Sequence, residues 1–261
     1  MATRARTQST LTAYVLHRYD WSESSLILDL FTREQGRLAV AAKGAKRPYS
    51  QLRPVLLPFQ RIHVALGRVP RSDSTQEPVS EVQNLRSAEW AGGAAMLTGA
   101  ALFSGFYLNE LLMKLMARHD PHAAVFDVYA QTLPALAAGD ETQVQAALRA
   151  FEITLLREVG VLPDLSLVTL TREAVRIDAR YSLLPESGVG VPRSGDAPVA
   201  GKTLIELQAA LEHGSLAALQ QVCANALPEL KSTLRGLLQY HLGSPVMRTR
   251  QVMLDVQALE R

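Results

Sequence analysis

The densest group of side chains that could do chemistry lies between residues 33 and 53. Six cations occur in this stretch, against a single acid, Glu34. A merely solvated loop usually mixes both signs of charge, whereas lysine and arginine together neutralise phosphates. Residues 43–48 read Lys-Gly-Ala-Lys-Arg-Pro and predict a turn directly after a strand, whose glycine lets backbone amides approach a phosphate. The sequence therefore predicts a phosphate-binding surface formed by Arg33, Arg37, Lys43, Lys46, Arg47 and Arg53.

Aromatic residues lie close to these cations in the sequence. Because every nucleobase has a π-face, an aromatic side chain can stack on unpaired bases without reading their sequence. The candidates for base stacking are Tyr14, Tyr19, Trp21 and Tyr49, and Phe31 lies in the same region. The alternative role for each ring is packing in a hydrophobic core.

The distribution of charge supports a polyanionic partner. The 261 residues carry a net charge of +2, which hides a strong asymmetry. Residues 1–71 contain 12 lysines and arginines against 4 acids, whereas the remainder contains 15 against 21. A basic first quarter on a mildly acidic body predicts one face that binds a polyanion.

Other motifs exclude several kinds of chemistry. Residues 201–203, Gly-Lys-Thr, resemble the end of a nucleotide-binding loop. This motif also needs a glycine at position 196, but the residue there is Asp196. His119 and His122 have no further metal ligand near them in the sequence, and the single cysteine, Cys223, lies in an apolar helical stretch. We therefore expect no metal, no cofactor and no enzyme activity. The alternatives are a nucleic-acid-processing enzyme with a basic substrate face, or a structural subunit that binds only protein.

The elements that must position the basic stretch have the pattern of short strands. Leu26, Leu28 and Leu30 alternate with Ile27 and Asp29, which is the two-residue period of a strand with a buried face. Several such strands within about 80 residues predict a small closed β-barrel of the OB type over residues 1–86. The expected strands cover residues 12–17, 25–31, 37–43, 55–66 (interrupted at Pro58) and 78–85.

The remaining residues, 87–261, have helical periodicity, so the fold class is α+β. The clearest helix lies between Asp140, a plausible N-cap, and Gly160, a plausible C-cap. Residues 181–201 are rich in proline and glycine and predict a loop or short hairpin inserted into the helical domain. The uncharged stretch 90–109 contains too many glycines and polar residues for a membrane span and predicts a buried helix. Further helices are expected over residues 88–117, 122–137, 203–212, 215–225 and 230–241.

Beyond these patterns, the sequence resembles the RecO family of bacterial DNA repair and recombination mediators. The most specific resemblance lies near the N-terminus, and weaker matches follow in the expected order over nearly the whole chain. The motifs are residues 13–18 (Ala-Tyr-Val-Leu-His-Arg), 23–37, 42–48 (Ala-Lys-Gly-Ala-Lys-Arg-Pro), 52–59, 107–112, 148–160 and 234–243. The resemblance implies an N-terminal OB-fold, a helical domain, and binding of single- and double-stranded DNA.

The resemblance also implies activities and partners. These are annealing of complementary strands and loading of RecA onto DNA coated with single-strand-binding protein (SSB), with RecR as partner. An apolar groove rimmed by cations is expected for the acidic, hydrophobic C-terminal tail of SSB, and Lys114 and Arg118 are its candidates. Many family members bind zinc through four cysteines, which residues 181–201 lack. The single cysteine and the lack of a recognisable secretory signal favour the cytoplasm, where the family is expected at the nucleoid.

Overall fold

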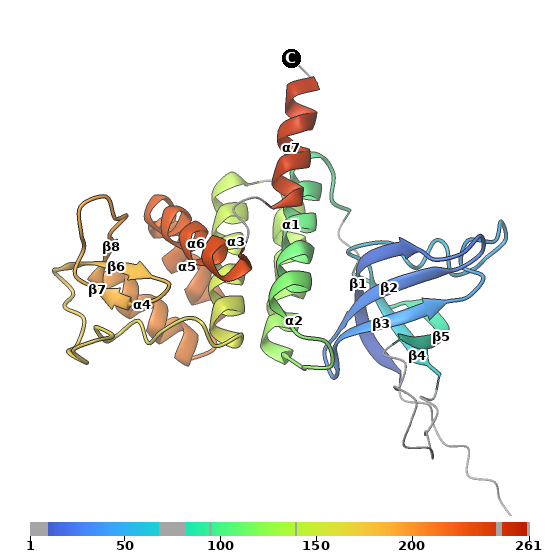
Figure 1. The fold of residues 1–261 in the computed structure, drawn as a ribbon, viewed down its shortest axis with the longest axis horizontal. Coiled ribbons are helices and arrows are strands. Elements are labelled where there is room, and N and C mark those ends of the chain that lie inside the picture. The colour runs from blue at the N-terminus through green and yellow to red at the C-terminus, as the bar shows by residue number, and fades with distance from the viewer. Residues whose placement is uncertain (1–9, 68–81, 94–95, 139, 244–246, 260–261) are drawn as a thin grey trace, which may run out of the picture. The chain divides into compact units, whose positions relative to one another are not determined.

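The computed structural model describes residues 10–67, 82–93, 96–138, 140–243 and 247–259. The chain divides into two compact units (Figure 1). The first contains Met1–Met96 together with Met116–Phe126, and the second contains Leu97–Leu115 together with Asp127–Arg261. The boundary that the sequence predicts after residue 86 falls inside a strand of the first unit, and the short segment 116–126 returns to that unit.

The first unit is a closed five-stranded barrel. Its strands follow each other around the barrel in the order β1-β2-β3-β5-β4, and only the pair β3 and β5 is parallel. The prediction of an N-terminal OB-type barrel is therefore confirmed. The strands are β1 (Leu11–Asp20), β2 (Leu26–Thr32), β3 (Gly36–Ala42), β4 (Arg61–Leu66) and β5 (Val82–Trp90).

Strand β2 is buried on both faces, whereas the sequence pattern predicted burial of only one face. Leu28 and Leu30 point into the barrel core, as the two-residue period predicts. The opposite face is covered by the segment 116–126 of the same unit, where Phe31 and Phe126 have ring centroids 5.4 Å apart. At Gly36, where β3 begins, a β-carbon would come within 2.0 Å of the Asp120 carbonyl oxygen, so only glycine permits this contact.

Several expected elements have different boundaries. The helix expected over residues 88–117 begins only at Gly99, because β5 continues to Trp90 in register with β4 and is followed by Gly92 and Gly93 in left-handed conformations. The strand expected over residues 55–66 covers only β4, since residues 51–56 form turns. Of the strand expected over residues 78–85, positions 78–81 lie outside the described residues.

The second unit is mainly helical, with a small three-stranded sheet in the order β7-β6-β8. That sheet contains β6 (Arg180–Leu184), β7 (Gly188–Gly190) and β8 (Val199–Ala200), so the inserted segment forms the short hairpin and one added strand. Helix α7 was not predicted. The helices are α1 (Gly99–Leu115), α2 (Ala123–Ala138, whose first turn belongs to the first unit), α3 (Glu141–Glu158), α4 (Gly201–Glu212), α5 (Leu216–Asn225), α6 (Leu227–Leu242) and α7 (Arg248–Leu259).

Helix α3 forms the centre of the second unit. The Asp140 side chain accepts a hydrogen bond from the Gln143 amide and caps its start, and Gly160 follows its end in a left-handed conformation, as the sequence predicts. Every residue from Ala146 to Leu156 is buried, because α5 and α6 pack against the helix. Within the described parts of the chain, no helix is long and apolar enough to cross a membrane.

Candidate nucleic-acid interface

Residues 43–53, here called the basic turn, are fixed to the end of the barrel by apolar anchors. Ala45 is buried in the barrel core, and Leu52 packs against that core. Gly44 has a φ of 73°, in the left-handed region, and its carbonyl accepts a hydrogen bond from the Arg47 amide at 3.1 Å. The turn is therefore a defined structure on a rigid support, from which polar side chains can extend into solvent.

The exposed side of the basic turn carries cations around a shallow depression of about 500 Å3. Lys43, Arg47 and Arg53 are exposed, and the Tyr49 side chain is 95% exposed. Among the described residues, no acidic side chain lines the depression, so an anion would meet cations and backbone there. Its lining consists of Lys43, Gly44, Arg47, Pro48, Tyr49 and Ser50.

Lys46 has a different role, because it fastens the basic turn to the loop between β1 and β2. Its ammonium lies 3.1 Å from an Asp20 carboxylate oxygen and donates a hydrogen bond to the Ser22 carbonyl at 3.1 Å. Its amide donates to the Ser24 carbonyl at 3.0 Å. Trp21, in the same loop, has a side chain that is 60% exposed. These contacts place Trp21 at the same end of the barrel as the basic turn.

The stacking candidates divide into exposed and buried rings. Tyr19 lies on β1 close to this loop, is exposed, and makes an edge contact with His17 at a centroid distance of 4.4 Å. Tyr14 is only 3% exposed, and its ring lies 5.4 Å from that of Phe126. Burial raises the pKa of Tyr14, partly offset by Arg61. Tyr14 and Phe31 are core residues with no face open to a base, so Tyr19, Trp21 and Tyr49 remain.

Arg37 is part of the interior of the first unit. It is 7% exposed, and its guanidinium makes two hydrogen bonds to Asp29, at 2.8 and 3.2 Å. It also donates to the Met116 carbonyl at 2.7 Å. The guanidinium is thus used for holding the segment 116–126, and we omit Arg37 from the candidate interface. An aspartate in an otherwise apolar strand was the sequence signal for this pairing, because a buried carboxylate needs a partner.

Arg33 lies at the far end of the barrel from the basic turn. It occupies the turn between β2 and β3, whereas the pairing of Leu26 with Ala42 is at the opposite end of the hairpin. The 7 residues of β2 separate these ends by roughly 20 Å, at about 3.3 Å per residue. The six cations that are close in sequence therefore do not form one cluster in space.

The two candidates for binding the SSB tail do not share a helical face. Helix α1 ends at Leu115, and Arg118 lies beyond it in the segment that belongs to the first unit. Lys114 forms an ion pair with Glu110 at 3.0 Å, and Arg118 approaches Asp29 at 3.7 Å. A helix that stops before Arg118 cannot give the expected groove.

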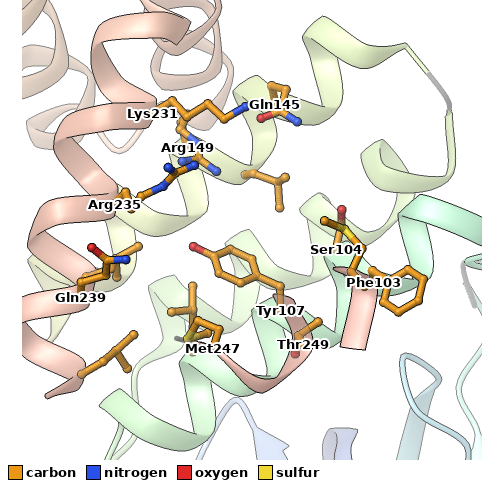
Figure 2. Close-up of a pocket in the computed structure, with 15 residues that line it drawn as sticks. Phe103, Ser104, Tyr107, Gln145, Arg149, Lys231, Arg235, Gln239, Met247 and Thr249 are labelled. Atoms are coloured by element: carbon orange, nitrogen blue, oxygen red, sulfur yellow. The ribbon is translucent and has the colours of Figure 1, made fainter. Parts of the chain in front are cut away.

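A better candidate for an apolar groove with cations lies within the second unit (Figure 2). This helical-unit pocket has a volume of about 320 Å3 and is formed by side chains of α1, α3, α6 and the start of α7. Its walls are mostly apolar, and three cations, Arg149, Lys231 and Arg235, lie along one side. The lining residues are Phe103, Ser104, Tyr107, Leu111, Gln145, Leu148, Arg149, Lys231, Arg235, Leu238, Gln239, Leu242, Met247, Thr249 and Met253.

A buried polar network forms the floor of this pocket. Arg149 pairs with Glu152 at 2.8 Å, and the Tyr107 hydroxyl donates to the same carboxylate at 2.7 Å. Burial raises the pKa of both Tyr107 and Glu152. The Arg149 Nε atom is buried and has no hydrogen-bond partner among the described residues. The network fixes the Arg149 guanidinium at the pocket, and its Nε–H group makes no hydrogen bond to the described residues.

The described residues give no support to a catalytic site. They contain no group of three or more histidine, cysteine, aspartate or glutamate side chains that could hold a metal ion. Asp196 accepts hydrogen bonds from Ser182 and the Arg193 amide, so it stabilises a turn. Cys223 is fully buried, and burial raises the pKa of its thiol to about 12, which agrees with a core role.

Comparisons with known proteins match both units. Residues 6–83 match the family described as Recombination protein O N terminal, and residues 96–250 match Recombination protein O C terminal. A DNA repair protein RecO from Albidiferax ferrireducens is 49% identical over 249 residues, covering 95% of each chain. Its counterpart from Variovorax paradoxus is 50% identical over 256 residues, covering 95% of this chain and 96% of that protein. With both parts matched in order over almost the full length, the chain belongs to the RecO family of DNA repair proteins.

Proposed function

We propose that this protein is a DNA-binding recombination mediator that anneals complementary strands and, with RecR, helps to load RecA onto DNA coated with SSB. The observation that carries the proposal is the gathering of exposed cations and exposed aromatic rings at one end of the barrel. Lys43, Arg47 and Arg53 supply the positive charge there, and Trp21 and Tyr49 supply the rings.

The chemistry of this surface suits both DNA forms. Lysine and arginine bind the phosphate backbone of single and double strands, with an affinity that falls as salt rises. Aromatic rings stack on unpaired bases and leave the hydrogen-bonding edges accessible. Annealing is limited by repulsion between two polyanions, so a surface that neutralises one strand and screens a second accelerates it without consuming a nucleotide.

The helical-unit pocket is our proposed site for the C-terminal tail of SSB, in place of Lys114 and Arg118. Such a tail offers apolar side chains, acidic side chains and a terminal carboxylate. The pocket offers apolar walls and a row of three cations, of which Arg149 is held rigidly by Glu152. The match of shape and charge supports this assignment.

An annealing assay tests the function directly. The quenching of a labelled strand by its complement is followed with and without protein, in the absence of ATP and divalent metal. We expect acceleration by the parent and a clear loss of it in the triple variant Lys43→Ala, Lys46→Ala, Arg47→Ala. Equal annealing by the triple variant would exclude the basic turn as the DNA-holding surface. An absolute need for ATP would favour an enzyme, and no DNA binding at low salt would favour a subunit that binds only protein.

A further inference from the structure

A buried carboxylate joins two helices beside the helical-unit pocket. Glu110, in the middle of α1, is 6% exposed, yet its partners come from α7. Its Oε1 atom accepts a hydrogen bond from the Arg248 amide at 3.0 Å, and Oε2 accepts from the Thr249 amide and hydroxyl at 2.9 and 2.7 Å. Lys114 completes the set with an ion pair at 3.0 Å. Both carboxylate oxygens are therefore satisfied.

The geometry is that of a helix cap supplied by another helix. The first amides of an α-helix have no partner within the helix, and negative charge is favoured at that end. Arg248 is the first residue of α7, and neither α7 nor the residue before it supplies a carboxylate to these amides in the described contacts. The side chain of Glu110 takes the place of the usual N-cap. Its pKa is lowered, because hydrogen bonds from Thr249 and the lysine contact outweigh the effect of burial, which acts in the opposite direction.

This cap is the best-defined polar contact of α7, which also packs against α1. None of its described side chains, at positions 248, 249, 251–253 and 255, is buried. For these side chains hydrophobic burial thus contributes less than it does for α3 and α6 in the same unit. Elements with few buried contacts open locally at low cost, so a polar contact at one end stabilises the position of the helix.

The capped end of α7 is also a wall of the pocket. Met247, just before α7, and Thr249 and Met253 of α7 line the pocket, whereas Glu110 is not among its lining residues. Methionine side chains adapt easily to a bound group, but they do so only when their backbone is in place. Any change in the position of this helical turn changes the shape of the pocket.

We infer that Glu110 is a positioning residue for ligand binding in the helical-unit pocket, because it latches α7 into the place where Met247 and Met253 form the pocket wall. This inference rests on the proposed role of the pocket as the site for the SSB tail. The contact between Glu110 and α7 does not depend on that role, so the latch and the ligand can be tested separately.

Hydrogen exchange of the free protein tests the latch. Glu110→Gln removes the charge and replaces one acceptor oxygen with a donor, at nearly the same volume. We expect exchange of the α7 amides to become faster by on the order of 10- to 100-fold, the effect of losing hydrogen bonds to a buried charge. Exchange in α3 should not change. Glu206→Gln is the matched control, since Glu206 lies on α4 and pairs with Lys202 at 3.8 Å, away from the pocket. Unchanged α7 exchange in Glu110→Gln would overturn the latch.

Peptide binding tests whether the latch between Glu110 and α7 positions the pocket for its ligand. A fluorescent peptide with the C-terminal sequence of SSB is titrated into parent and variants. Glu110→Gln should weaken binding about tenfold, with Glu206→Gln equal to the parent. Faster α7 exchange with unchanged peptide affinity would overturn the positioning role. A parent that binds no peptide would overturn the inference together with the proposed ligand, while the exchange data would still report on the latch.

Discussion

Removing two exposed cations of the basic turn should change the salt dependence of DNA binding by a predictable amount. Lys43 and Arg47 line the depression, and neither takes part in the tether that uses Lys46. Each lost phosphate contact lowers the slope of log affinity against log salt by about 0.9 for duplex DNA and about 0.7 for single strands. The double variant Lys43→Ala, Arg47→Ala should therefore lower the slope by about 1.8 and about 1.4, respectively.

These slopes translate into ratios that an anisotropy titration resolves. Between 50 and 200 mM salt, the parent should lose about 12-fold more affinity for duplex DNA than the double variant, and about 7-fold more for a single strand. The loss should be the same for oligonucleotides of unrelated sequence, because phosphate contacts carry no sequence information.

Two further variants show whether a change in the salt slope comes from the basic turn or from any loss of positive charge. Lys46→Ala should lower the slope by less than either cation of the double variant, since its ammonium is already paired with Asp20. Arg193→Ala with Lys202→Ala removes two exposed cations from the second unit and should leave the slope near that of the parent. An unchanged slope in the double variant, or an equal decrease in this control, would refute the argument that the basic turn holds the backbone.

Two further predictions follow from the positions of individual side chains. Trp21→Ala with Tyr49→Ala should weaken single-strand binding by about 1–3 kcal/mol per stacked base, with duplex affinity and the salt slope nearly unchanged, as measured by the same titrations. Arg37→Met should lower the free energy of unfolding by about 3 kcal/mol in urea denaturation, because it removes both hydrogen bonds to the buried Asp29 and leaves only Arg118, at 3.7 Å, as a charge partner. A stable Arg37→Met protein with a lower salt slope would instead return Arg37 to the interface.

Local patterns were sufficient where one short segment determines its own structure. The alternation of leucines predicted β2, and the polar cap and terminal glycine predicted α3 almost to the residue. The same reasoning failed at residues 88–98, where helical composition continues across the end of β5. Pairing of β5 with β4 depends on residues distant in sequence, which a window of neighbouring residues does not contain.

The candidate interface was predicted in part for the same reason. Counting charges along the chain located the basic turn, but it could not distinguish Arg47, which is exposed, from Arg37, which is buried against Asp29. It also treated Arg33 as a neighbour of Lys43, although the length of a strand separates them. Charge density identifies a region, whereas the register of the hairpin decides which of its members face the same ligand.

The helical-unit pocket could not be predicted from any one segment, because its walls come from four helices spread over residues 103–253.

The basic turn and the helical-unit pocket suit different ligands, DNA and the SSB tail, because their cations are held differently. Exposed cations on a turn suit a long polyanion of any sequence, and their contribution falls steeply with salt. A guanidinium held by a buried carboxylate beside apolar walls suits one chain end of defined shape, and buried charges are screened much less by salt. Raising the salt concentration should thus weaken DNA binding more than binding of the SSB tail, because Arg149 is buried, whereas Lys43, Arg47 and Arg53 are exposed.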